Sequence, residues 1–477
     1  MRGAYWIAFV VCAAAATIPL LVTPILPSSD LPEHMAQVAI WKHFDDPCFR
    51  FADIFEVRWA TPYLLGYLVC RALAVVLSVS VAMKVTVWLS IVLLPLSMRE
   101  LLKRGGDPWL SLLGFLLAYG YAFYWGFLNF AITIPIGIFF IALLYDARPR
   151  MLALTLLGIL MMASHALVFV FAAAVTVPVA LLRRSWRLLL PLVPASLLMV
   201  LFVVRLRETR QASQGGITWK LGLHRFFDLP SMLVANAYEV LGLVVVAVVI
   251  LAIAAGKPRI AEVPARWVLL AVAGTVFFLA PQGAFGTAYL APRFAIFVAV
   301  GAMMVLDVRA SRALVVAIVL AWAALLTWRF QAFGVEAREF EGLLARIPPN
   351  RRIALFNVMP FSEHVPGPVY WHFGALYQVR RGGVAAFSFA SHDYPQLLGY
   401  RPGAELIVNS RSTPVDGIDW PGVLQYDYVL FRGADSRRWL FRDAPVPFVL
   451  SARSGSWWLF ESPRARAARQ ACAPLDE

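Results

Sequence analysis

Apolar residues dominate the first 330 residues in stretches typical of membrane-spanning helices, and short polar loops separate these stretches. A helix that crosses the hydrocarbon core of a bilayer needs about 20 mostly apolar residues. The alternation predicts an α-helical polytopic membrane protein with about eleven transmembrane helices. The expected spans lie at about 4–26, 82–98, 109–125, 127–144, 151–164, 166–182, 188–204, 232–255, 267–281, 293–306 and 313–330.

One more apolar stretch, residues 61–79, carries Arg71 and opens with a Thr-Pro-Tyr triplet. We interpret it as an interfacial or re-entrant helix in a long first outer loop. The alternative is a true span beside a loop that breaks the positive-inside rule. Without that span, the rule places the N-terminus in the cytoplasm and everything after Phe330 outside the cell membrane.

Composition supports this class, because 61% of the residues are hydrophobic, 15% are charged and the mean hydropathy is +0.72. Such values are far from those of soluble domains. The net charge of +14 could indicate a nucleic-acid partner. The basic residues fall mainly in short loops between apolar stretches, where the positive-inside rule accounts for them, so no nucleic acid is expected as a partner.

The pattern changes near residue 331, which divides the chain into a transmembrane domain, 1–331, and an extracytoplasmic domain, 332–477. The second region is expected to be a small α/β domain, with an amphipathic helix followed by strands. The helix is predicted at 336–347 and the strands at 353–358, 426–431, 447–451 and 457–461, the last two as a hairpin.

Polar side chains accumulate where this topology places the outer face. Asp30, Glu33 and His34 follow the first span directly. Later outer turns carry Tyr124, Asn129, His165, Lys220, Arg225 and Arg293, and the outer domain carries His372. A membrane enzyme needs such groups to converge at one surface, so these residues are the candidate site.

Three motifs, together with the long first loop and the outer domain, resemble the GT-C class of polytopic glycosyltransferases. They are Asp30-Leu31-Pro32-Glu33-His34, Tyr124-Trp125-Gly126-Phe127-Leu128-Asn129-Phe130 and Ser164-His165-Ala166. The resemblance implies an enzyme that moves a sugar, with inversion, from a polyprenyl-phosphate donor to an acceptor on the extracytoplasmic face. It also implies a bacterial inner membrane, with membrane lipid as a partner, and it leaves open whether the acceptor is a glycan, a lipid or a protein.

The same resemblance implies that Asp30 acts as the general base or as a metal ligand, with Glu33 and His34 in support. A base is needed because a sugar hydroxyl is a poor nucleophile. The structural alternative for Asp30 is a helix N-cap, for which aspartate is a favoured residue. No Asp-Xaa-Asp pair follows the first span, so the involvement of a divalent metal stays open.

The leaving phosphate needs a cation at headgroup depth. We expect Arg293 to hold it, with Lys220 and Arg225 as a second set, although such residues also serve as plain interfacial anchors. His165, Asn129, Tyr124 and His372 are expected to contact substrate. For His165, a hydrogen bond to a backbone carbonyl is an equal alternative.

Two other functions remain open at this stage. A transporter or flippase of a lipid-linked glycan would use the outer residues as a gate, although such proteins tend to place ionisable groups near the bilayer midplane. A noncatalytic membrane scaffold would leave the charged first loop unexplained. Cys48 and Cys472 are both predicted outside, where a disulfide could form, but two unpaired thiols are the expectation.

Overall fold

The computed structural model describes residues 2–208, 216–234, 240–284, 287–308, 311–391, 396–404, 420–434, 441, 444–467 and 475. The chain divides into two compact units. Unit 1 comprises Met1–Leu21, Ala60–Gly66 and Thr86–Trp328, and unit 2 comprises Val22–Trp59, Tyr67–Val85 and Arg329–Glu477. The first-loop segments around Asp30 therefore belong to the same unit as the C-terminal region, a grouping that the sequence did not indicate. The predicted boundary at 331 stays a prediction.

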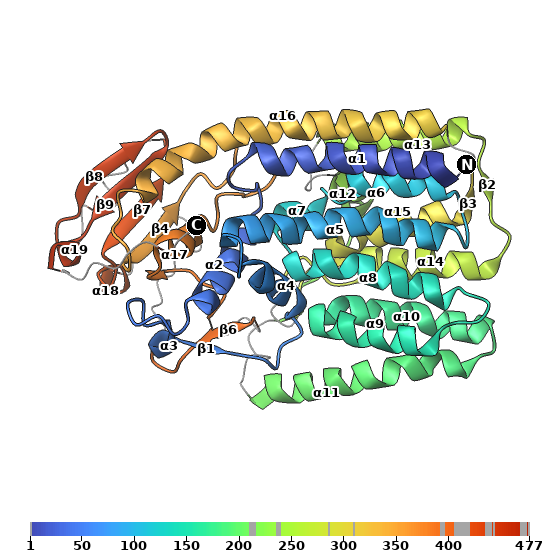
Figure 1. The fold of residues 1–477 in the computed structure, drawn as a ribbon, viewed down its shortest axis with the longest axis horizontal. Helices are drawn as coiled ribbons and strands as arrows, with labels where there is room; N and C mark the ends of the chain where they lie inside the picture. The colour runs from blue at the N-terminus through green and yellow to red at the C-terminus, as the bar shows by residue number, and fades with distance from the viewer. Residues whose placement is uncertain are drawn as a thin grey trace. The chain divides into compact units, whose positions relative to one another are not determined.

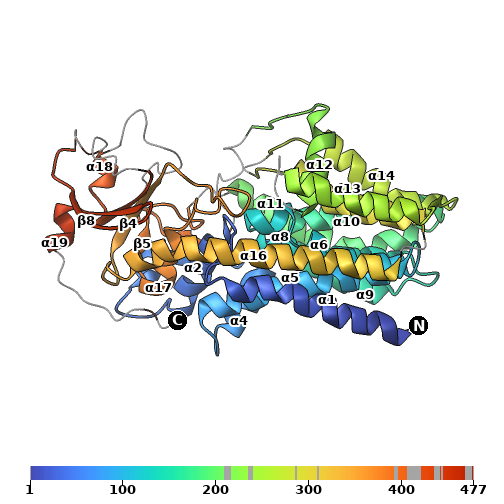
Figure 2. The ribbon, with the colours of Figure 1, turned by 90° about the horizontal axis from the view of Figure 1, so that it is seen from above.

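Unit 1 is helical (Figure 1). Its elements are α1 (Arg2–Val22), α5 (Val79–Leu102), η1 (Pro108–Leu113), α6 (Gly114–Leu117), α7 (Tyr121–Trp125), α8 (Leu128–Leu144), α9 (Met151–Ser164), α10 (Ala166–Leu182), η2 (Trp186–Leu192), α11 (Val193–Glu208), α12 (His224–Val234), α13 (Val240–Ala255), β2 (Arg259–Ile260), α14 (Pro264–Leu279), η4 (Ala291–Phe294), α15 (Ala295–Val305), β3 (Leu306–Asp307) and the first part of α16 (Arg312–Leu344). Helices α8, α9 and α10 pack against one another, and α14 packs beside α15. Helix α12 packs beside α13 (Figure 2).

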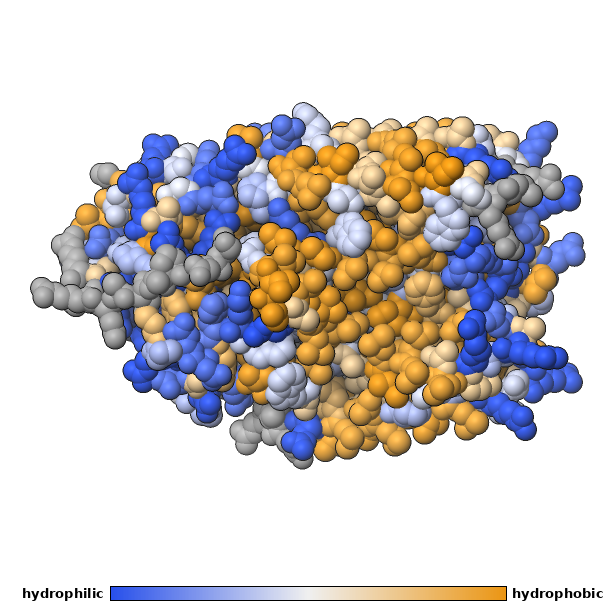
Figure 3. Space-filling view, in the orientation of Figure 1, coloured by the Kyte–Doolittle hydropathy of each residue, from blue (hydrophilic) through white to orange (hydrophobic). Residues whose placement is uncertain are grey.

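The surface of unit 1 carries a broad apolar band over these helices (Figure 3). Large apolar side chains such as Leu156, Val200 and Leu201 are more than half exposed. A soluble surface rarely carries so wide an apolar patch. Four helices within the described residues are long and apolar enough to cross a membrane, namely Gly3–Val22, Val79–Leu102, Trp186–Arg205 and Arg312–Leu344, and shorter apolar helices accompany them. The chain is an integral membrane protein, while the number of eleven spans stays a prediction.

The expected span at 109–125 is not one helix but η1, α6 and α7. Glycine lowers helix stability, and two glycines allow close backbone contacts here. A Cβ on Gly114 would lie 2.8 Å from the Cα of Pro95, and one on Gly120 would lie 2.6 Å from the carbonyl oxygen of Leu233. The backbone of Gly120 is extended, which ends the helix before α7.

The segment expected to be interfacial contains one short helix, and the last expected span is part of a longer helix. Residues 61–79 hold α4 (Leu65–Leu73), whose nine residues rise only about 14 Å, too little to cross the core. The span expected at 313–330 and the helix expected at 336–347 form one continuous helix, α16. No proline lies between them, and the helix continues through the single glycine there, Gly334.

Unit 2 contains a five-stranded mixed sheet with the order β5-β4-β7-β9-β8 (Figure 1). The remaining elements are α2 (Leu31–Lys42), α3 (Phe51–Ile54), β1 (Phe55–Val57), α4, β4 (Arg352–Asn357), α17 (Ala375–Arg381), β5 (Val384–Ala385), β6 (Leu398–Tyr400), α18 (Trp420–Val423), β7 (Tyr428–Arg432), β8 (Val449–Ser454), β9 (Trp457–Glu461) and α19 (Pro463–Ala467). The expected C-terminal α/β fold and the β8–β9 hairpin are confirmed, and Gly455, with a φ of 53°, makes the hairpin turn.

Two contacts tie the first-loop residues to the C-terminal region within unit 2. Strand β1 pairs antiparallel with β6, and α2 packs against α17. Cys48 is disulfide-bonded, which corrects the expectation of an unpaired thiol. Cys472 lies outside the described residues.

Candidate functional site

Helix α2 begins directly after the candidate base and is held by one row of polar side chains. Asp30 occupies the N-cap position and a proline occupies the first turn, both typical of a helix start. Glu33 and Gln37 are four residues apart and share one face of the helix, and Ser29 lies just before the N-cap. All three side chains are buried and bond the backbone of the C-terminal region. The Ser29 hydroxyl donates to the Pro368 carbonyl, and the side-chain oxygens of Glu33 and Gln37 accept from the N–H groups of Phe389 and Leu398. This face fixes the position of Asp30 in unit 2.

The Asp30 side chain makes no capping hydrogen bond, although the residue stands at the N-cap. Its Oδ1 lies 3.4 Å from Nε2 of His372 instead, and 17% of the side chain is exposed. The imidazole of His372 stacks on Phe387 with a centroid distance of 4.4 Å. The capping alternative therefore does not account for the carboxylate, which pairs with a histidine and stays accessible.

The Glu33 carboxylate is buried and engaged. It accepts a hydrogen bond of 2.9 Å from the backbone N–H of Phe389. Burial raises the pKa of the Glu33 carboxyl well above its ordinary value; the Phe389 N–H opposes this shift, and the charge of Asp30 adds to it. Glu33 thus holds the segment around Phe389, whereas Asp30 remains open to a reacting group.

His34 lies in a second hydrogen-bonded chain on the same helix. Its Nδ1 lies 2.7 Å from the hydroxyl oxygen of Tyr67, and that hydroxyl donates to the side-chain oxygen of Gln396 at 2.9 Å. Since the hydroxyl proton goes to Gln396, the Tyr67 oxygen accepts from Nδ1–H of His34. The residue is buried, and its ring also meets Phe389 edge to face.

In unit 1, two candidate residues stand at the start of neighbouring helices. Asn129 lies in the first turn of α8, and His165 occupies the N-cap of α10. Asn129 accepts a hydrogen bond from the Gly66 N–H, but its Nδ2 is buried without a hydrogen-bond partner, and so is Nδ1 of His165. The ring of Phe130 lies 5.2 Å from that of His165.

Arg293 lies beside these helix starts. Its guanidinium carbon is 3.6 Å from the ring centroid of Phe127 and 5.6 Å from that of Phe130. It donates to the carbonyls of Ala288 and Tyr289 at 3.2 and 3.3 Å. Tyr289 has a φ of 56°, a region that a bulky residue rarely adopts, so this turn is strained. The arginine is held in place by aromatic faces and a strained turn.

The second cationic set lines a cavity of about 160 Å³ in unit 1. Lys220 is exposed at this cavity. Arg225 donates to the carbonyls of Lys220, Phe277 and Ala280, so its guanidinium is largely occupied with the end of α14. Tyr124 is buried in the helical core, while its neighbours Tyr121 and Trp125 line the cavity.

No group of three or more histidine, cysteine, aspartate or glutamate side chains could hold a metal ion within the described parts of the chain. The sequence did not reveal the pairing of His372 with Asp30 or the role of Phe389. These residues lie more than 330 positions beyond Asp30 and Glu33, and the only local signal was the aromatic run around His372.

The sequence matches no known protein family and no curated protein. Solved structures do match, and two of them are crystal structures of ArnT from Cupriavidus metallidurans. The structure bound to undecaprenyl phosphate has a TM-score of 0.58 and the apo structure one of 0.51. Each is 11% identical in sequence, and the match covers 96% of this chain and 98% of the ArnT chain. This chain therefore has the fold of ArnT, which confirms the GT-C resemblance at the level of the fold.

Proposed function

We propose that this protein is a membrane glycosyltransferase that moves a sugar from a polyprenyl-phosphate donor to an acceptor hydroxyl. The reaction takes place on the extracytoplasmic face of a bacterial inner membrane, with the N-terminus in the cytoplasm. The observation that carries the proposal is the Asp30 carboxylate, which stands at an N-cap without capping and pairs with His372 instead. The fold shared with an undecaprenyl-phosphate-bound ArnT supports the donor class.

Asp30 is the proposed general base. The acceptor hydroxyl gives its proton to the carboxylate as its oxygen bonds to the anomeric carbon of the donor sugar, on the face opposite the phosphate. The bond between that carbon and the phosphate oxygen breaks, and the polyprenyl phosphate leaves with the electron pair. His372, through Nε2, orients one carboxylate oxygen so that the other faces the acceptor. The geometry supports a positioning role for Glu33, through Phe389, rather than a direct one.

Arg293 is the proposed partner of the leaving phosphate. A guanidinium pairs with phosphate through two parallel hydrogen bonds, and its charge offsets the one that develops as the bond breaks. Its fixed position over Phe127 reduces the entropy lost on binding. His165 and Asn129 each keep a buried nitrogen without a partner, which suits hydrogen bonding to the donor. Lys220, at the rim of the cavity, is a weaker candidate, and Arg225 supports the cavity wall.

The proposal is tested by the extracytoplasmic glycan and glycolipid profile of a deletion strain. The strain is complemented with wild type, Asp30→Asn or Asp53→Asn at matched membrane abundance. Asp53 is the matched control because it lies in the same first loop but is exposed and paired with Arg50. We expect wild type and Asp53→Asn to restore a missing sugar, whose mass identifies it, and Asp30→Asn to fail. Equal restoration by Asp30→Asn would favour transport or scaffolding.

A further inference from the structure

Unit 2 contains an open pocket of about 360 Å³ at the C-terminal end of α2, separate from Asp30 and its partners. We call it the α2 pocket. It is lined by Trp41, Lys42, His43, Phe44, Asp45, Asp46, Val57 and Arg71. The residues come from the last turn of α2, the following loop, β1 and α4. None of them takes part in the proposed transfer reaction.

The α2 pocket holds charged side chains of both signs that form no ion pair with one another. Lys42 and Arg71 contribute two positive charges, and Asp45 and Asp46 contribute two negative charges. Among the described residues, Lys42, Asp45 and Arg71 form no ion pair, with each other or with any other residue. Asp46 accepts one hydrogen bond from the Cys48 N–H. A ligand that carries one negative and one positive group would pair with the two cations and with the two carboxylates.

The aromatic residues favour a ligand at the membrane surface. The guanidinium of Arg71 lies 5.8 Å from the ring centroid of Trp41, which meets Trp59 edge to face at 5.5 Å. Trp59 is 56% exposed. Tryptophan accumulates at the level of lipid headgroups because its ring has an apolar body and a polar edge.

Apolar side chains of helix α4 lie on the same face of the helix as Arg71. Leu68, Arg71 and Val75 share one face through their spacing of three and four residues, because hydrogen bonds continue the helical turn as far as Leu77. Leu68 is 42% and Val75 70% exposed, while Cys70 lies on the opposite, buried face. A helix with this division lies in the interface of a bilayer. The apolar side chains would meet acyl chains while Arg71 reaches a headgroup.

We propose that the α2 pocket binds the zwitterionic headgroup of a bilayer lipid with a primary ammonium group, that is, phosphatidylethanolamine. The phosphate pairs with Arg71 and Lys42, and the ammonium donates hydrogen bonds to Asp45 and Asp46. A choline headgroup has no N–H to donate, and a glycerol headgroup has no positive charge for the carboxylates. The pocket therefore discriminates among lipids by charge and by hydrogen bonding.

The test uses full-length protein in detergent and native mass spectrometry with equimolar phosphatidylethanolamine, phosphatidylcholine and phosphatidylglycerol. We expect wild type to retain phosphatidylethanolamine in preference to the other two. Arg71→Gln should weaken its retention about tenfold, the effect of one lost charge-assisted hydrogen bond. Asp45→Asn should remove the preference over phosphatidylglycerol, because it deletes an anion that repels that lipid and attracts ammonium.

Arg50→Gln is the matched control, since Arg50 is an exposed arginine of the same unit paired outside the pocket. It should retain the wild-type preference. Soluble phosphoethanolamine should not compete at concentrations where the lipid does, because it lacks the chains that α4 would contact. Equal retention of the three lipids by wild type, or an unchanged preference in both pocket variants, would overturn the proposal. Asp30→Asn should bind lipid like wild type, so the outcome is independent of the proposed transfer.

Discussion

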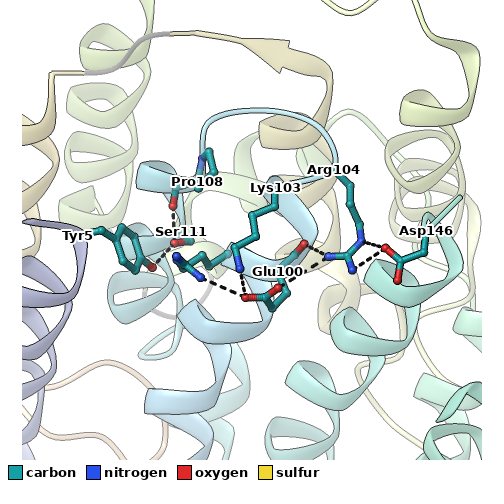
Figure 4. Close-up of polar contacts among 8 residues, drawn as sticks. Tyr5, Glu100, Lys103, Arg104, Pro108, Ser111 and Asp146 are labelled. Atoms are coloured by element: carbon teal, nitrogen blue, oxygen red, sulfur yellow. Dashed lines mark hydrogen bonds and ion pairs between the residues drawn. The ribbon is translucent and has the colours of Figure 1, made fainter. Parts of the chain in front are cut away.

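The two ends of the unit 1 helices use their charged residues in different ways. At one end, where α5 and α8 finish, Arg104 pairs with Asp146 at 2.7 Å, and Lys103 pairs with Glu100 at 2.5 Å (Figure 4). At the same end, Arg183 donates to the carbonyls of Leu144, the last residue of α8, and of Tyr145 and Asp146, which follow it. We call this the paired end. Its cations sit at helix C-termini, where the helix dipole favours positive charge.

At the other end, which we call the open end, α8 and α10 begin. His165 and Asn129 each keep a buried nitrogen without a hydrogen-bond partner there, and Arg293 lies over Phe127. A buried polar atom without a partner costs about 1 to 3 kcal/mol. This difference supports the proposal that the open end contacts the donor, while the ion pairs of the paired end hold the helices together.

The largest expected effect is on activity at the open end. Arg293→Ala should lower the rate of sugar transfer about 100-fold per folded molecule, as is typical when one group that stabilises transition-state charge is removed. Arg293→Lys should recover part of the rate, because it keeps the charge but not the bidentate geometry. Transfer is measured in membrane vesicles at matched protein abundance. Arg183→Ala is the control, and a loss of equal size in that variant would remove the contrast.

The second effect is on stability at the paired end. Arg183→Ala deletes the hydrogen bonds to the carbonyls of Leu144, Tyr145 and Asp146, so the free energy of unfolding should fall by about 2 kcal/mol. Thermal unfolding of the purified protein in detergent measures this change. The rate of transfer per folded molecule should stay within about twofold, because no substrate contact is lost. Arg184→Ala, one residue along the chain, serves as the matched variant and should change the unfolding temperature less.

The sequence predicted the helices and the basic loops better than it predicted which charged side chains are paired. The basic loops that contain Arg104 and Arg183 followed from the alternation of apolar and charged residues, because that alternation is local. The β8–β9 hairpin was predictable for the same reason. The residues of the open end were visible in the sequence only as isolated positions. Nothing in the sequence distinguished Arg225, which donates to three carbonyls, from Arg293, which lies over the ring of Phe127. Partners of a guanidinium are set by tertiary packing, which the order of residues does not display.

The site around Asp30 in unit 2 shows even more clearly that tertiary contacts cannot be predicted from the sequence. Asp30 was identified because charged residues after a membrane span are unusual. Its contact with His372 and the bond from Glu33 to Phe389 join positions more than 330 residues apart. The sequence therefore assigned Glu33 the same supporting role in catalysis as His34, and only burial separates it from Asp30. Which of two neighbouring carboxylates is open depends on the fold of a distant segment.

The third prediction extends the contrast to these two carboxylates. Burial raises the pKa of Glu33, so the folded state keeps a proton that the unfolded state loses above its ordinary value of 4.5. Glu33 therefore makes its full contribution to the free energy of unfolding below pH 4.5. That contribution is lost as the pH rises through the raised pKa of the folded state. Glu33→Gln should remove this decline, because the amide oxygen still accepts from Phe389 and carries no charge.

Unfolding of Glu33→Gln and wild type is compared between about pH 4 and 8, with the exposed Glu56→Gln as control. The variant should match wild type at low pH and exceed it at neutral pH, and it should retain transfer activity. A loss of transfer as complete as in Asp30→Asn would show that Glu33 acts on the substrate directly and that the two carboxylates form one site.

The smallest expected effect concerns a single ion pair at the paired end. The Arg104 and Asp146 side chains are 19% and 25% exposed, so solvent screens their attraction only in part. A double-mutant cycle with Arg104→Ala and Asp146→Ala should give a coupling free energy of about 0.5 to 1 kcal/mol, which salt reduces. The cycle is measured by unfolding in detergent at two ionic strengths. Transfer should be unchanged in all three variants, since neither residue lies at the open end. A coupling near zero would mean that the carbonyl contacts of Arg183, rather than ion pairs, hold the paired end together.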